Sequence, residues 1–231
     1  MAALNFNRAL IVGAGAGLSA SLARLFSREG LQVVLAARNT AKLEALCKET
    51  RARAYACDAA KPEDVAKLFA ALDIDGGAPD VVVYNASSRV RAPLIHLDPA
   101  DVKRAIEVTA YGAFLVAREA ARRMVPKNYG AILFTGASAG VKGYPESATF
   151  AMGKFALRGL AQSMARELHP QGIHVAHFVI DGGIAREGRT PSSPDALLDP
   201  DAIALNYLNV LRQPRSAWTW EMELRPWVEK F

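Results

Sequence analysis

The stretch ALIVGAGAGLSASLARLF, residues 9–26, joins an apolar run to a helical pattern through three alternate glycines. Gly13, Gly15 and Gly17 follow a run too apolar for a half-exposed strand and precede a helix with apolar residues at three- and four-residue spacing. Glycines there let the chain turn tightly and bring backbone N–H groups against a phosphate at the positive end of the helix. The context predicts a nucleotide-phosphate site, with a plain tight turn as the alternative.

The rest of the chain repeats this alternation of short apolar runs and longer helical patterns. Strands are expected at 8–12, 32–36, 53–56, 80–85, 131–135 and 173–180, and helices at 17–29, 39–50, 62–72, 99–125 and 147–169. Repeated strand–helix units predict an α/β fold, a doubly wound, mainly parallel sheet with helices on both faces.

The last fifty residues break the alternation. The segment DGGIAREGRTPSSPD, residues 181–195, has the composition of a loop, so 184–198 is expected to be a flexible flap over a site or a plain solvated loop. Asp199 is expected to cap a helix whose first residue is Pro200. The tail SAWTWEMELRPW, residues 216–227, alternates apolar and polar residues and predicts a seventh strand with one buried face.

Three polar residues near expected strand ends indicate which nucleotide would bind. Arg38 follows the second strand, where an arginine accommodates a ribose 2′-phosphate and an acidic residue would accept hydrogen bonds from a free 2′-hydroxyl. NADP(H) is therefore favoured over NAD(H), unless Arg38 is simply solvated. Asp58 closes the third strand, where an adenine edge would lie, and Asn85 closes the fourth, although each could be only a cap or turn residue.

Length and composition favour one compact unit. The chain has 231 residues, 51% of them hydrophobic, which is enough for a single domain over 1–231, and a formal net charge of +5 that suits an anionic ligand such as a nucleotide cofactor. Cys47 and Cys57 form no CxxC or Cys/His cluster, so no metal site is expected. No signal peptide or long apolar run is apparent, and basic residues are not interleaved with aromatics, so a cytoplasmic protein without membrane or nucleic-acid partners is expected.

Together these residues resemble the short-chain dehydrogenase/reductase family, a Rossmann-type fold that binds NAD(P). The family's GxxxGxG motif is matched by Gly13 and Gly17, with Ser19 at the third glycine, and its NAG motif appears as Asn85, Ala86 and Ser87. The resemblance also implies cofactor contacts at Leu18, Ala86, Gly182 and Ile184, and a homodimer or homotetramer built on the two long helices and the last strand.

The catalytic positions of that family are only partly matched. Its serine falls on Ser138, and its YxxxK pair reads Phe150 and Lys154. Its helix asparagine falls on Thr109, and the proline after its sixth strand falls on Asp181. In the family the tyrosine protonates the carbonyl oxygen while the lysine lowers the pKa of that tyrosine and holds the nicotinamide ribose. Such proton transfer contributes about 100- to 10,000-fold in rate, so losing the hydroxyl is a large loss.

Two residues could replace the missing acid. Tyr144 lies in the loop before the catalytic helix, with its backbone restricted by Pro145, although it could be an ordinary surface tyrosine. Asp181 could hold a raised pKa if desolvated, although DGG is also turn chemistry. The sequence thus predicts an NADP(H)-dependent oxidoreductase for an unidentified small carbonyl, alcohol or activated alkene, with Ser138, Lys154 and Tyr144 or a water in the reaction. The alternative is a catalytically impaired NADP(H)-binding regulatory or partner protein.

Overall fold

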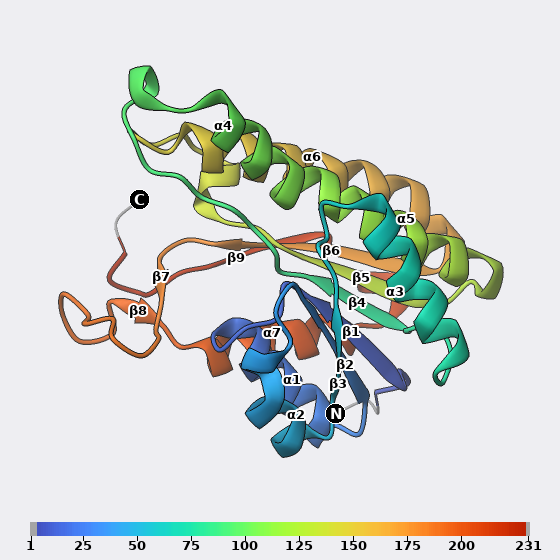
Figure 1. Cartoon of the computed structure of the whole chain (residues 1–231). Coiled ribbons are helices and arrows are strands. Elements are labelled where there is room, and N and C mark those ends of the chain that lie inside the picture. Colours follow the sequence, from blue (N-terminus) through green and yellow to red (C-terminus); the bar gives the residue numbers. More distant parts are fainter. Residues whose placement is uncertain (1–3, 230–231) are drawn as a thin grey trace.

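A seven-stranded parallel sheet organises the protein in the computed structural model, which describes residues 4–229 (Figure 1). The strand order is β3-β2-β1-β4-β5-β6-β9, and every neighbouring pair is parallel. The strands are β1 (Arg8–Val12), β2 (Gln32–Ala37), β3 (Arg53–Ala56), β4 (Val81–Tyr84), β5 (Gly130–Thr135), β6 (Ile173–Ile180) and β9 (Glu221–Leu224). The predicted doubly wound Rossmann-type fold is confirmed.

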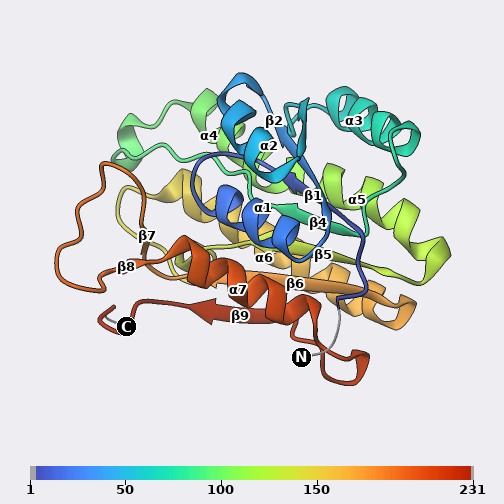
Figure 2. The same cartoon turned by 90° about the horizontal axis from the view of Figure 1, so that it is seen from below.

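Helices cover both faces of the sheet. They are α1 (Leu18–Arg28), α2 (Glu44–Thr50), α3 (Pro62–Ile74), α4 (Pro99–Ile106), α5 (Gly112–Met124), α6 (Ala148–Leu168) and α7 (Pro200–Leu211). Helices α1, α2 and α7 pack in one apolar cluster, and α3, α5 and α6 pack in the other, across the sheet (Figure 1). Seen from below, α1 and α7 lie side by side across the near face (Figure 2). Strands β1, β4, β5 and β6 are buried throughout because side chains on both faces meet a helix layer.

The predicted long helix over 99–125 is interrupted. A π-helical turn at Glu107–Tyr111 separates α4 from α5. Such one-turn bulges occur inside α-helices, and an overall helical pattern in the sequence does not distinguish them from a continuous helix.

The end of the chain is also more broken than the sequence predicts. The last strand spans only Glu221–Leu224, after a short 3-10 turn at Arg215–Ala217. Trp218 lies outside the strand and stacks on His174, with ring centroids 4.5 Å apart. The expected loop over 184–198 is bounded by a small parallel pair, β7 (Gly183–Ile184) with β8 (Leu197–Leu198). The predicted cap of α7 is confirmed, since the Asp199 carboxylate accepts a hydrogen bond from the Asp201 amide at 2.9 Å.

Candidate active site

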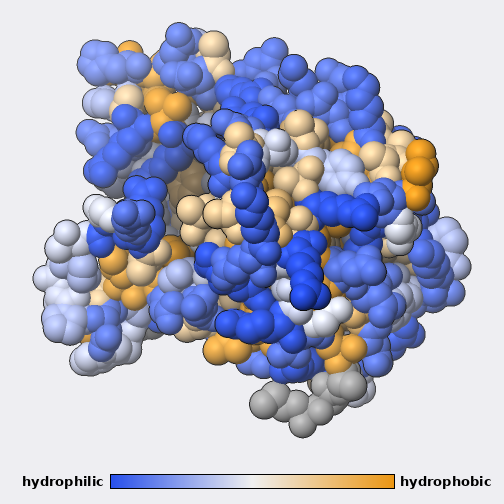
Figure 3. Space-filling model, turned by 60° about the horizontal axis from the view of Figure 1, so that its bottom comes forward, coloured by the Kyte–Doolittle hydropathy of each residue, from blue (hydrophilic) through white to orange (hydrophobic). Residues whose placement is uncertain are grey.

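A cavity of about 910 Å³ opens at the carboxyl ends of β1, β4, β5 and β6. This is the crevice in which open α/β sheets bind ligands, at the point where the strand order reverses between β1 and β4. The space-filling view shows a hollow on the left of the molecule with a largely hydrophilic rim (Figure 3). Of the predicted site residues, the cavity is lined by Gly17, Leu18, Asn85, Ser138, Tyr144, Phe150, Lys154, Asp181, Gly182 and Ile184.

The glycine turn shapes one end of this cavity. Gly13 has a φ of +83°, and a Cβ there would lie closer than 3.0 Å to atoms of Ala86, so only glycine fits. Gly15 and Gly17 differ, because a Cβ on either would meet no atom within 4 Å. The turn therefore leaves open space in front of its backbone, as a cradle for phosphate oxygens requires.

The helix behind the turn presents an uncapped amino end to the cavity. Gly17 at the N-cap has no side chain to bind the first amides of α1, and the first turn of the helix has no acidic residue. These amides and the positive end of the helix dipole suit an anionic ligand. The chain therefore fits a nucleotide cofactor at this end.

Ser19, at the third glycine position, links the turn to β4. Its hydroxyl donates to the Gly13 carbonyl at 3.1 Å and accepts from the Asn85 side-chain amide at 2.7 Å. The serine is buried, and both of its hydrogen bonds hold predicted cofactor residues in place. This departure from the motif thus preserves the architecture of the site.

The residues predicted for the adenosine end lie outside the cavity lining. Arg38 is exposed at the end of β2. Asp58 lies two residues beyond the end of β3 and forms an ion pair with Arg104 at 2.7 Å. Burial raises the pKa of the Asp58 carboxyl, but the hydrogen bond from Arg104 and the amide of Ala60 outweigh it and lower the pKa overall. Arg104 on α4 thus binds one oxygen of Asp58 and the Ala60 amide binds the other, and the place of Asp58 at an adenine edge stays a prediction.

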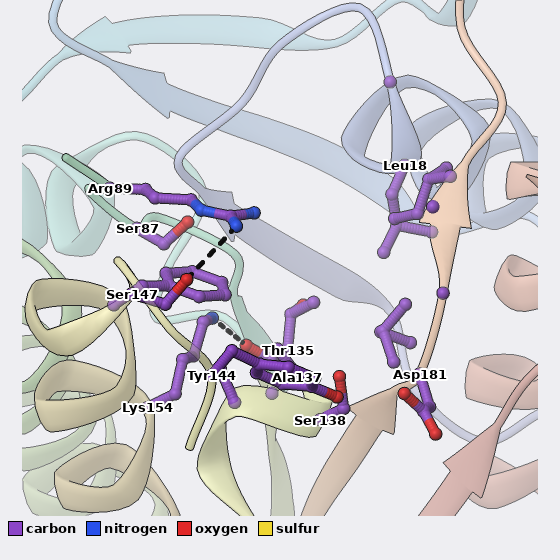
Figure 4. Close-up of a pocket in the computed structure, with 18 of the residues that line it drawn as sticks. Leu18, Ser87, Arg89, Thr135, Ala137, Ser138, Tyr144, Ser147, Lys154 and Asp181 are labelled. Carbon is purple, nitrogen blue, oxygen red and sulfur yellow. Dashed lines mark hydrogen bonds between the residues drawn. The ribbon is translucent and has the colours of Figure 1, made fainter. Parts of the chain in front are cut away.

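Lys154 is the most unusual residue of the cavity. Its side chain is buried, with 3% of the residue exposed, and its ammonium donates to the Thr135 carbonyl at 2.7 Å (Figure 4). The same ammonium lies 5.6 Å from the centroid of the Phe150 ring. Burial lowers the pKa of Lys154 to about 7. A buried cation is costly, so the fold sustains this lysine at the expense of stability.

Thr109, at the family's asparagine position, lies away from the cavity. It is fully buried in the π-helical turn, and its hydroxyl accepts from the Ser88 amide at 3.1 Å. Thr109 also packs so closely on α6 that a Cβ at Gly153 would collide with it. It therefore ties the chain after β4 to the helices, a structural role.

The two candidate acids differ in their surroundings. Asp181 is 3% exposed and paired with Arg225 at 2.9 Å and with Lys142 at 3.5 Å. Asp181 is therefore buried but paired, because Arg225 and Lys142 approach it from other parts of the chain. Tyr144 is 42% exposed, lines the cavity and lies under the Lys142 ammonium, 5.7 Å from its ring centroid. Of the two, only Tyr144 brings a hydroxyl group to the cavity.

The cavity also contains residues that the sequence does not predict. Arg89 and Arg91 line it from the segment after β4, and Thr135 lines it from the end of β5. The signal for the arginines was present in SSRVRAP, residues 87–93, where two cations follow a predicted strand end. Behind the site, the buried His177 pairs with Glu221 at 3.0 Å, and burial lowers its pKa to about 4.

Residues 4–229 contain no group of three His, Cys, Asp or Glu side chains arranged to hold a metal ion. In the same range, no helix combines the length and the apolar character needed to cross a bilayer.

The sequence matches a known family over most of its length. The family model for the short chain dehydrogenases matches residues 7–191. A short chain aldehyde dehydrogenase of Euphorbia lathyris is 30% identical over 173 residues, which make up 72% of this chain and 60% of that protein. The chain thus spans less than two thirds of that relative's length. Farnesol dehydrogenase of Aedes aegypti is 27% identical over 96% of this chain and 97% of its own.

Solved structures of short-chain dehydrogenases are also similar to this chain. A short-chain dehydrogenase from Rhodopseudomonas palustris is 34% identical and superposes with a TM-score of 0.83 over 96% of this chain and 99% of its own. A metagenomic short-chain oxidoreductase solved in complex with NADP is 27% identical, with a TM-score of 0.86 over 99% of this chain and 100% of its own.

Proposed function

Because the chain belongs to the short chain dehydrogenase family, we propose that it is an NADP(H)-dependent oxidoreductase acting on a small carbonyl, alcohol or activated alkene. The observation that carries the proposal is the burial of Lys154 at the wall of a cavity shared with Ser138 and the uncapped end of α1. A buried lysine is destabilising and has a use if it holds a bound cofactor. The names of the relatives from Euphorbia lathyris and Aedes aegypti, an aldehyde and a farnesol dehydrogenase, point to the same substrate range.

The cofactor would be held by residues from several turns. We assign the phosphates to the turn of Gly13, Gly15 and Gly17 with the amide of Leu18, and the remaining contacts to Arg38, Asp58, Asn85, Ala86, Lys154, Gly182 and Ile184. When bound, the nicotinamide supplies or accepts a hydride, chemistry that no side chain can perform.

The chain's own residues would orient the substrate and move the proton. Ser138 lines the cavity and can donate a hydrogen bond to the substrate oxygen. Lys154 would hold the nicotinamide ribose, and Tyr144 would protonate the oxygen from the loop before α6. The Lys142 ammonium over the ring of Tyr144 would help to orient it through a cation–π contact.

Replacing Tyr144 by phenylalanine tests the proton donor. We expect kcat for carbonyl reduction to fall about 100-fold or more, because general acid catalysis is lost, while NADPH affinity stays unchanged. Turnover on a panel of carbonyls and enones measures kcat, and fluorescence titration with NADPH measures the affinity. Both values are compared with those of Phe150→Tyr, which restores a hydroxyl on the helix. Unchanged turnover in Tyr144→Phe would assign the proton to water or to another residue.

The cofactor preference depends on Arg38. We expect Arg38→Gln to lower the affinity for NADPH by about 10- to 100-fold, the effect of one charged hydrogen-bonding contact, and to leave NADH affinity almost unchanged. Paired titrations with NADPH and NADH measure the change in preference. Equal losses for both cofactors would mean that Arg38 supports the fold and not the 2′-phosphate.

One observation favours the alternative of an NADP(H)-binding protein without turnover. Two catalytic positions of the family, Phe150 and Thr109, have lost the usual side chain, and Thr109 has a structural role in its place. Binding without turnover in the panel, with activity only in Phe150→Tyr, would support a regulatory or partner protein.

We further propose a single NAD(P)-binding domain over the chain that assembles as a homodimer or homotetramer. The outer faces of α5 and α6 carry Phe114, Met152 and Phe155, each 43–50% exposed. Exposed apolar side chains that lie together often mark a protein–protein contact. Light scattering at two protein concentrations measures the assembly.

A further inference from the structure

Arg89 lies in the cavity without a carboxylate partner. Its guanidinium carbon is 5.1 Å from the centroid of the Phe150 ring, and one of its nitrogens is 3.4 Å from the Ser147 hydroxyl. In the described part of the chain, no salt bridge involves Arg89, whereas its neighbour Arg91 is paired with Glu146 at 3.1 Å. Arg89, an exposed residue, therefore brings to the cavity wall a positive charge that no carboxylate of the described residues pairs with.

The position of Arg89 separates it from the nucleotide end. In the close-up, Arg89, Ser147 and Lys154 lie on one side of the cavity, and Leu18, from the start of α1, lies on the other (Figure 4). Arg89 therefore lies away from the phosphate cradle of the glycine turn. It faces the space beside Phe150, which a substrate would enter.

The acidic residues that line the cavity, Asp181 and Glu229, form no salt bridge with Arg89 in the described part of the chain. Asp181, on the opposite side, is already paired with Arg225 and Lys142. The only hydrogen bond of the Arg89 side chain among the described residues is the long one to neutral Ser147, so most of its donors remain available.

The ring of Phe150 gives the guanidinium a fixed platform. Guanidinium groups stack on aromatic faces and present a planar fork of N–H donors that matches a carboxylate. A guanidinium stays protonated at any physiological pH, so Arg89 can bind an anion but cannot supply the missing proton. Arg89 can therefore recognise an anionic group of the substrate, but it cannot act as the proton donor.

We propose that Arg89 binds the carboxylate of the substrate, so that the carbonyl compound reduced is an oxo acid and the alcohol oxidised is a hydroxy acid. This role rests on the oxidoreductase function proposed above. In the reduction, a hydride adds to the carbonyl carbon of the oxo acid, a proton adds to its oxygen, and NADPH becomes NADP⁺. Arg89 takes no part in bond formation and holds the neighbouring carboxylate.

The test compares oxo acids with their methyl esters. Pyruvate, acetoacetate and benzoylformate, each beside its methyl ester, are assayed with NADPH on the wild type, Arg89→Gln, Arg89→Lys and Arg28→Gln. Arg28 is an exposed residue at the far end of α1, so its variant controls for the loss of one charge. We expect the wild type to prefer at least one acid over its ester by about 10- to 100-fold in kcat/KM, the effect of a charged hydrogen bond.

The variants give the decisive comparison. We expect Arg89→Gln to lose the preference for the acid while kcat/KM for the ester changes by less than about twofold, and Arg28→Gln to behave as the wild type. Arg89→Lys should retain part of the preference, because charge remains without the planar fork. Equal losses on acid and ester in Arg89→Gln would overturn the proposal, since they would place Arg89 at the reacting oxygen or in the fold. The absence of acid preference in the wild type for every pair would overturn it as well.

A binding experiment separates this proposal from the function on which it rests. Calorimetric titration of the protein–NADP⁺ complex with each oxo acid and each ester requires no turnover. Acid binding that is lost in Arg89→Gln supports the carboxylate site even if no reduction is seen, in which case only the catalytic proposal fails. Turnover of esters with no selective acid binding would leave the oxidoreductase intact and refute the role of Arg89.

Discussion

Lys154→Met is expected to stabilise the folded protein and to remove its turnover. Methionine fills a similar volume without a charge, so the burial that holds the pKa of Lys154 at about 7 ceases to oppose folding. We expect the free energy of unfolding near pH 7 to rise by about 1–4 kcal/mol, net of the lost hydrogen bond to Thr135. We expect turnover to fall by about 100-fold or more, because the cofactor is no longer held in its reacting position.

The pH dependence of this difference identifies its cause. In the unfolded chain Lys154 titrates near its usual pKa of 10.5, and in the folded chain near 7. Between these values the unfolded state binds more protons, so Lys154 makes the wild type gain stability as the pH rises through this window. The advantage of Lys154→Met should therefore be full below about pH 7 and shrink towards pH 10. Urea unfolding of both proteins at several pH values measures it.

Lys142→Met is the matched control for stability. Lys142 is half-exposed and forms an ion pair with Asp181, and its hydrogen bond to Tyr144 together with that carboxylate raises its pKa. The free energy of unfolding of Lys142→Met should therefore equal that of the wild type or be lower. If Lys154→Met is less stable than the wild type at every pH, the lysine carries no burial penalty and the argument from its cost fails.

Gly13→Ala is expected to cost about 2–5 kcal/mol of folding free energy. The added Cβ would collide with Ala86, which is overpacking, and would also force a non-glycine residue to a φ of +83°. The end of β4 and the phosphate turn would have to move apart, so NADPH affinity should fall as well. Thermal unfolding and NADPH titration measure the two effects.

Gly15→Ala separates the fold from the binding site. A Cβ there meets no atom within 4 Å, so stability should change by less than about 0.5 kcal/mol. The methyl group would nevertheless occupy the open space in front of the turn, so NADPH affinity should fall. Equal loss of stability in the two variants would mean that the open space at Gly15 is absent in solution.

The sequence predicts the fold well because its signals are local. The apolar runs that become β1, β4, β5 and β6 are buried on both faces, and the glycine turn lies between a strand and a helix as expected. The π-helical turn at Glu107–Tyr111 is not predicted, because residues of a helical pattern suit a π-helical turn and an α-helix alike.

The site was predicted less completely because its chemistry depends on distant partners. Asp181 has its ion pair with Arg225, which comes from beyond β9, and Asp58 has its partner on α4. The contact of Arg89 with Phe150 joins the segment after β4 to α6. Pairings of this kind depend on side-chain placement in the folded chain, and residue spacing does not encode them.

The most direct test of the account follows the hydride itself. Wild-type protein is mixed with NADPH deuterated at the transferring carbon and with the carbonyl panel, and the product is examined by mass spectrometry after a single turnover. We expect an alcohol or saturated product that carries one deuterium, formed by the protein with Phe150 unchanged. The oxidoreductase function would be contradicted if wild-type protein saturated with deuterated NADPH left the substrate unreduced and unlabelled, while Phe150→Tyr transferred the label.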